Sequence, residues 1–123
     1  MKATATVSVP NHREESLRHL PEAAQAAFAR FAAEGNPVAL DPIMFAILDD
    51  FIPKTPVRPL AELPGDTRLI DDLGFDSLAI TEVVFFTEDL FGIAITNEEI
   101  VRVRTLADLR RFIQLKVTGQ PVR

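Results

Sequence analysis

Residues 69–78 read LIDDLGFDSL, and the interpretation of the whole chain starts from this stretch. A proline-rich loop ends here and a strongly apolar helix begins, so Asp76 or Ser77 is the expected N-cap of that helix. The Ser77 hydroxyl is then in the first helical turn, among carboxylates. A nucleophilic serine needs an adjacent base, usually histidine, and the sequence around Ser77 contains none. The placement favours a serine that carries a group over one that cleaves a bond.

The apolar spacing on either side of this stretch predicts an all-α domain. We expect a helix from Ser77 to Phe91, closed by Gly92, and before it a helix capped by Asp41 and ended by Pro53. The patterns Thr96-Asn97-Glu98-Glu99 and Thr105-Leu106-Ala107-Asp108 predict a short helix and a last long one. The expected fold is a four-helix bundle of three long helices and one short. Between its first two helices runs a long loop whose apolar residues, Leu60, Leu63, Leu69, Ile70 and Leu73, are expected to pack.

An N-terminal extension precedes this bundle. Apolar residues recur at helical spacing from Leu17 to Phe31 and predict one extra helix over about residues 21–34, which Gly35 ends. We divide the chain into an extension over 1–38, whose first 12 residues are expected to fray, a domain over 39–118 and a tail over 119–123. The apolar stripe of the extension has three possible uses: packing on the domain, dimerisation or binding of an enzyme. Packing within the chain is the simplest of the three.

The composition is that of an ordinary globular protein. The 123 residues are 47% hydrophobic and 25% charged, and they contain no cysteine, which excludes disulfides and thiol catalysis. No apolar run approaches the length that spans a membrane, and the first residues lack the apolar stretch of a signal peptide, so we expect a cytoplasmic protein. We also expect it to be a monomer. His12 and His19 are the two histidines, and no carboxylate cluster completes a ligand set around them, so no metal site is expected.

The charge is unevenly distributed. Residues 66–99 hold nine acidic residues and one arginine, a net charge of −8, whereas residues 100–123 have a net charge of +5. An acidic surface around Ser77 disfavours nucleic acid and favours basic protein partners. A solvated helix face without a partner is the alternative interpretation.

With these residues in place, the chain resembles the acyl carrier protein family over about residues 39–118. The resemblance rests on Asp71-Asp72-Leu73-Gly74-Phe75-Asp76-Ser77-Leu78, which is similar to the family's DLG-x-DSL attachment signature. Supporting similarities are Glu82, the run Glu88-Asp89-Leu90-Phe91-Gly92-Ile93-Ala94-Ile95, the run Asn97-Glu98-Glu99 and the run Thr105-Leu106-Ala107-Asp108-Leu109.

The resemblance implies a non-catalytic carrier. A phosphopantetheinyl transferase would attach 4′-phosphopantetheine to Ser77, with Asp76 and Leu78 as recognition residues, and acyl groups would be held on that arm as thioesters. The partners would be enzymes of fatty-acid, lipid or polyketide-type biosynthesis. Basic patches on these enzymes would dock on an acidic and apolar stripe of this chain. We assign to this stripe Leu78, Glu82, Phe85, Glu88 and Asp89, while a core position for Phe85 is an equal alternative.

Some residues depart from the family pattern. Ala79 and Ile80 follow Leu78 where many fatty-acid-synthesis carriers have an acidic and then a small polar residue, and Phe85-Phe86 makes the helix more apolar. With the extension, these departures favour a specialised carrier over a housekeeping one. Two alternatives stay open. A peptidyl or aminoacyl carrier usually has a Gly-Gly-His/Asp-Ser pattern, and an unmodified helical interaction module would only share the fold.

Overall fold

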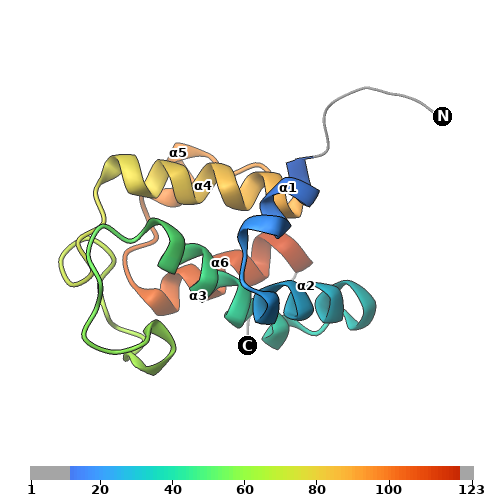
Figure 1. Cartoon of the computed structure of the whole chain (residues 1–123). Coiled ribbons are helices and arrows are strands. Elements are labelled where there is room, and N and C mark those ends of the chain that lie inside the picture. The colour runs from blue at the N-terminus through green and yellow to red at the C-terminus, as the bar shows by residue number, and fades with distance from the viewer. Residues whose placement is uncertain (1–11, 120–123) are drawn as a thin grey trace.

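The computed structural model describes residues 12–119, and along them the chain is helical without a strand. The predicted all-α fold is confirmed. Its core helices are α3 (Leu40–Phe51), α4 (Ser77–Phe91), the short α5 (Asn97–Ile100) and α6 (Leu106–Thr118). The long connection between α3 and α4 contains one 3₁₀ turn, η2 (Leu60–Glu62). Helix α3 packs against both α4 and α6, and Figure 1 shows the long loop at the N-terminal end of α4.

The caps of the last three helices follow the sequence prediction. Asp76 caps α4 by accepting a hydrogen bond from the Ala79 N–H at 2.8 Å. Capping boxes open α5 with Thr96 and Glu99, and α6 with Thr105 and Asp108. The N–H of Thr96 lowers the pKa of Glu99, and the N–H of Arg104 lowers the pKa of Asp108, because both hydrogen bonds favour the carboxylate form.

The predicted cap of α3 is wrong. A 3₁₀ turn, η1 (Pro37–Ala39), leads directly into the helix, and the Asn36 side chain caps that turn by accepting from the Val38 N–H at 3.0 Å. Because η1 already orders the backbone, α3 begins at Leu40, one residue before Asp41. The Asp41 carboxylate is therefore in the first turn, where it pairs with Arg110 of α6 at 3.1 Å.

The extension holds two helices where the sequence predicted one. The second, α2 (Glu22–Glu34), has nearly the predicted bounds, and α1 (His12–His19) precedes it. Periodicity missed α1 because seven of its eight residues, HREESLRH, are polar. α1 packs on α4 and α2 packs on α3, so this part of the extension packs within the chain. The predictions for residues 1–11 and 120–123 lie outside the described residues.

One hydrophobic core runs through the bundle and the extension. Leu20, Ala24 and Ala27 belong to the same buried cluster as Ile43, Ile47, Leu90 and Ile113, and the rings of Phe28 and Phe91 lie 5.7 Å apart. Three of the five apolar loop residues, Leu60, Leu69 and Leu73, are buried, and Leu63 packs against them. The expectation for Ile70 is wrong: its side chain is 59% exposed, at the surface beside Ser77.

Candidate functional site

Ser77 is the first residue of α4 and its side chain is exposed. The Asp76 carboxylate takes the Ala79 N–H, and the Ile80 N–H donates to the Asp76 carbonyl oxygen at 3.0 Å. Within residues 12–119, no hydrogen bond uses the N–H of Ser77, the N–H of Leu78 or the Ser77 hydroxyl. The start of α4 therefore presents a free hydroxyl next to two free backbone donors, in the positive half of the helix dipole.

The loop before Ser77 is held by its own backbone. The N–H groups of Gly74 and Phe75 donate to the carbonyl oxygens of Ile70 and Leu69, at 3.1 and 3.0 Å. The Leu69 N–H donates to the carbonyl oxygen of Arg104 at 2.9 Å, which ties the loop to the segment before α6. With Leu73 and Phe75 buried on either side of Gly74, the approach to Ser77 is fixed rather than free to move.

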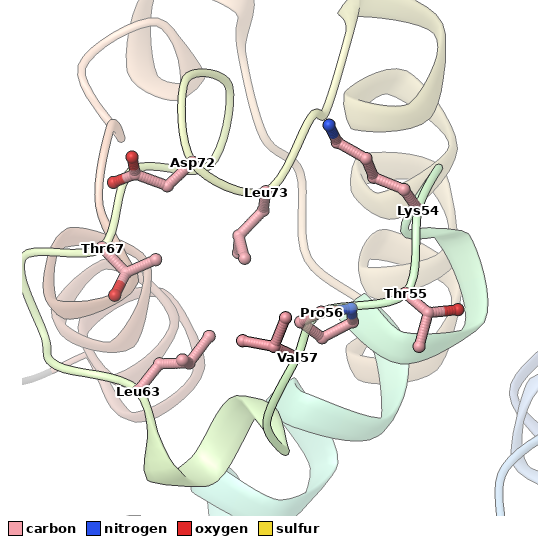
Figure 2. A pocket seen from close by; sticks show the side chains of 8 residues that line it. All are labelled: Lys54, Thr55, Pro56, Val57, Leu63, Thr67, Asp72 and Leu73. Atoms are coloured by element: carbon pink, nitrogen blue, oxygen red, sulfur yellow. The ribbon is translucent and has the colours of Figure 1, made fainter.

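Gly74 is the tight point of this loop. Its φ is +79°, in the left-handed region, and a Cβ there would lie 3.2 Å from the Cε atom of Lys54. Figure 2 shows Lys54 on one side of a hollow of about 400 Å³, with Leu73 and Asp72 on another side and Val57 and Leu63 below. The segment after α3 therefore covers the backbone that leads to Ser77.

A larger cavity of about 740 Å³ adjoins Ser77 itself. It lies between the loop before α4, the first turn of α4, α5 and the start of α6. Its apolar lining comes from these separate segments: Ile70, Ile80, Ile100, Val101 and Val103. Sequence reasoning missed this cavity because its walls lie up to 40 residues apart in the chain.

Most of the acidic residues near Ser77 are engaged inside the fold. Asp71 pairs with Arg68 at 2.9 Å, Asp72 accepts from the Arg68 N–H at 2.8 Å, and Glu88 accepts from the Ile95 N–H at 2.7 Å. On α4, Glu82 and Asp89 are exposed and have no such partner among the described residues. The surface around Ser77 is acidic, but several of its carboxylates already have partners within the chain.

The stripe assigned to α4 is at the surface. Leu78 is 69% exposed and Phe85 is 61% exposed, with Glu82 exposed between them. The opposite face of the helix is buried through Ala79, Val83, Thr87 and Leu90. The alternative that Phe85 belongs to the core is therefore wrong.

No histidine accompanies Ser77. Both histidines belong to α1, which packs at the C-terminal end of α4 (Figure 1), the end opposite Ser77. Among residues 12–119 there is also no group of three His, Cys, Asp or Glu side chains that could hold a metal ion. Ser77 therefore has an exposed hydroxyl and no histidine beside it that could act as a base.

The family model described as "Phosphopantetheine attachment site" matches residues 54–113, which include Ser77, the loop before it, α4, α5 and the first half of α6. The chain is 38% identical over 56 residues to an acyl carrier protein of Solidesulfovibrio magneticus and covers 72% of that protein. The chain belongs to the acyl carrier protein family. The family model's description names phosphopantetheine, and the covalent cofactor of this family is 4′-phosphopantetheine.

Two mycobacterial carriers extend the comparison. The chain is 41% identical over 56 residues to the acyl carrier protein MbtL of Mycobacterium sp. (strain MCS), covering 46% of this chain and 63% of that protein. It is 32% identical over 78 residues to the meromycolate extension acyl carrier protein of Mycobacterium tuberculosis, covering 63% of this chain and 67% of the relative. The chain thus spans just under two thirds of the first of these relatives. No solved structure shows a significant match.

The site fits the family's cofactor. A phosphodiester on the Ser77 oxygen would lie within reach of the free N–H groups that begin α4, where negative charge is favoured. The cavity beside Ser77 gives an arm a partly apolar surface to fold against. Among residues 12–119 there is no helix long and apolar enough to cross a bilayer.

Proposed function

We propose that Ser77 is the attachment point of the 4′-phosphopantetheine arm. The observation that carries this proposal is the exposed Ser77 hydroxyl at the start of α4, unused by the fold and next to a cavity. The arm supplies the thiol on which acyl groups are held as thioesters, which accounts for carrier function in a chain without cysteine. Asp76 and Leu78 flank the serine as recognition residues for a phosphopantetheinyl transferase, while Asp76 also caps the helix.

The protein itself acts without catalysing a step. Transfer forms a bond between the Ser77 oxygen and the phosphorus of the phosphopantetheine half of coenzyme A. The pyrophosphate bond breaks, and 3′,5′-adenosine diphosphate leaves. The serine proton needs a base, and the fold places no histidine near Ser77, so we assign the base to the transferase. Loading and processing of the acyl group belong to partner enzymes in the same way.

Partner enzymes are proposed to dock on α4 through Leu78, Glu82, Phe85 and Asp89, with Glu88 at the edge because its carboxylate also holds the Ile95 N–H. Glu82 and Asp89 match a basic patch, and the two apolar side chains match a shallow apolar site between basic residues. The cargo pathway is fatty-acid, lipid or polyketide-type biosynthesis in the cytoplasm. The apolar α4 and the packed extension support a specialised member of the family.

Intact-mass measurement tests the attachment point. Co-expression with a broad-specificity phosphopantetheinyl transferase should add the mass of one phosphopantetheinyl group to the wild-type chain and none to Ser77→Ala. Thr81→Ala is the matched control, since Thr81 is an exposed hydroxyl one turn later on the same helix, and it should be modified like the wild type. An increment that survives Ser77→Ala would contradict the site. No increment on the wild type would instead favour an unmodified interaction module.

A further inference from the structure

The cavity beside Ser77 has an amphipathic lining that the carrier function alone does not explain. Its apolar part includes Ile80, Ile100 and Val103, from α4, α5 and the segment before α6. Four charged residues line the same cavity: Arg68, Asp71, Arg104 and Asp108. A cavity meant only for a saturated hydrocarbon chain has no use for guanidinium groups on its lining.

The carboxylates of this lining are already paired. Asp71 pairs with Arg68 at 2.9 Å, and Asp108 pairs with Arg111 at 2.8 Å while accepting from the backbone N–H groups of Arg104 and Thr105. The Arg104 guanidinium, by contrast, makes no ion pair and donates no hydrogen bond within residues 12–119. Arg104 is thus the charged residue of the lining whose guanidinium N–H groups are all available to a ligand.

The backbone of Arg104 is held on both sides of its α-carbon. Its N–H donates to Asp108 Oδ2 at 3.2 Å, and its carbonyl oxygen accepts from the Leu69 N–H at 2.9 Å. The second of these bonds joins Arg104 to the same loop that positions Ser77. The side chain therefore starts from a fixed point relative to the attachment residue, which is what a selective contact requires.

We propose that Arg104 selects an oxygenated acyl cargo, one with a hydroxyl, keto or carboxylate oxygen near the thioester. The planar guanidinium binds such acceptor oxygens, and the isoleucine and valine side chains beside it take the hydrocarbon part. Ser77 lines the same cavity, so the tether delivers the cargo to this place. This inference rests on the proposed attachment at Ser77.

The test compares matched cargoes on matched variants. The transferase loads three coenzyme A forms onto the apo chain: unacylated, octanoyl and 3-hydroxyoctanoyl. For each thioester we measure a protection factor, the hydrolysis rate of the free pantetheine thioester divided by that of the carrier-bound one. The variants are Arg104→Gln and the control Arg102→Gln, which removes an exposed arginine two residues away that does not line this cavity.

In the wild type, the 3-hydroxyoctanoyl form should be protected about threefold more than the octanoyl form, the size expected for one solvent-accessible charged contact. Arg104→Gln should bring this ratio to about one, and Arg102→Gln should keep it. The ¹⁵N shift of Arg104 Nε should move with the hydroxylated cargo. The melting temperatures of both variants should equal that of the wild type, which would show that the fold is intact.

Three results would overturn the inference. Equal protection of the two cargoes on the wild type, or an unchanged ratio in Arg104→Gln, removes the selectivity from Arg104. A full Arg104 shift in the unacylated form assigns the guanidinium to the phosphodiester instead. Absence of any mass increment at Ser77 overturns the proposed function as well, which separates that failure from a loaded carrier without selectivity.

Discussion

Gly74 determines the path of the backbone that leads to Ser77. Its left-handed backbone lets the loop turn between the buried Leu73 and Phe75, and Lys54 lies directly over the place where a side chain would be. Both the backbone conformation and the contact with Lys54 therefore favour glycine at this position. The position of Ser77 relative to its cavity depends on this turn.

Gly74→Ala should lower the free energy of unfolding by about 1–2 kcal/mol, the cost of a left-handed non-glycine residue, and should also slow phosphopantetheinylation. Gly35→Ala is the control, because Gly35 has a similar φ of +70° but no neighbouring atom within 4 Å of a Cβ and lies far along the chain from Ser77. Urea unfolding and time-resolved intact mass measure the two effects. Loading of Gly74→Ala at the wild-type rate would show that the turn does not position Ser77.

For single residues, the sequence indicates which side chain has the functional chemistry, but it does not indicate which side chains from other segments lie beside it. The run Asp76-Ser77-Leu78 contains the residue that caps the helix and also matches the family signature. Ser77 could therefore be predicted as the candidate residue from neighbouring residues in the sequence alone. The pairing of Asp71 with Arg68, and the place of Arg104 beside the cavity, depend on segments that meet only after folding. Net charge by segment therefore overestimated how many carboxylates are free for a partner.

Helix α4 serves two purposes on two faces. Its buried face holds the core, and its exposed face presents Leu78, Glu82 and Phe85 to solvent. Large exposed apolar side chains arranged along one helix face, with acidic neighbours, are typical of an interaction surface. A change on this face should affect partners and leave the fold unchanged.

Phe85→Ala should reduce turnover by a cognate acyl-processing enzyme about tenfold, the loss expected for an aromatic anchor, and Glu82→Lys should reduce it further at low salt. Both should change the free energy of unfolding by less than about 0.5 kcal/mol. Val57→Ala, an equally apolar change at a side chain that is 97% exposed on the loop, is the control. A large loss of stability in Phe85→Ala would contradict the surface role.

Helix ends were predictable where a cap is encoded locally, and less so elsewhere. The boxes at Thr96 and Thr105 need only residues three apart, and both formed as predicted. The cap predicted for α3 is wrong because the turn Pro37–Ala39 leads directly into the helix, whose N-cap is Ala39. Helix α1 was missed because its residues are almost all polar, so apolar periodicity gives no signal, and its packing on α4 joins segments far apart in the chain.

On the scale of the whole molecule, the extension is part of the core. Leu20 is 3% exposed within the common cluster, and the Arg13 side chain donates from Nε to the Leu90 carbonyl oxygen of α4 at 2.8 Å. Phe28 adds a ring contact to Phe91. We propose that residues 12–118 unfold as one cooperative unit, although only part of this range matches the family model.

Leu20→Ala should lower the free energy of unfolding by about 2–4 kcal/mol, as for a buried leucine, and should shift the entire transition. Leu115→Ala, at a side chain that is 44% exposed on α6, should cost less than about 1 kcal/mol. Circular dichroism and ¹⁵N amide signals from α6 should report the same midpoint. A variant in which α6 keeps its wild-type midpoint would show that the extension is a separate unit.

The packing of α1 and α2 against α4 and α3 also determines how this carrier can be transplanted. A hybrid protein built from the domain predicted over residues 39–118 would cut the chain after α2 and discard both helices. The graft would keep Ser77 and its signature but would leave Phe91 and the α3 side of the core open to water. A cassette intended for exchange between assembly lines should therefore begin ahead of α1.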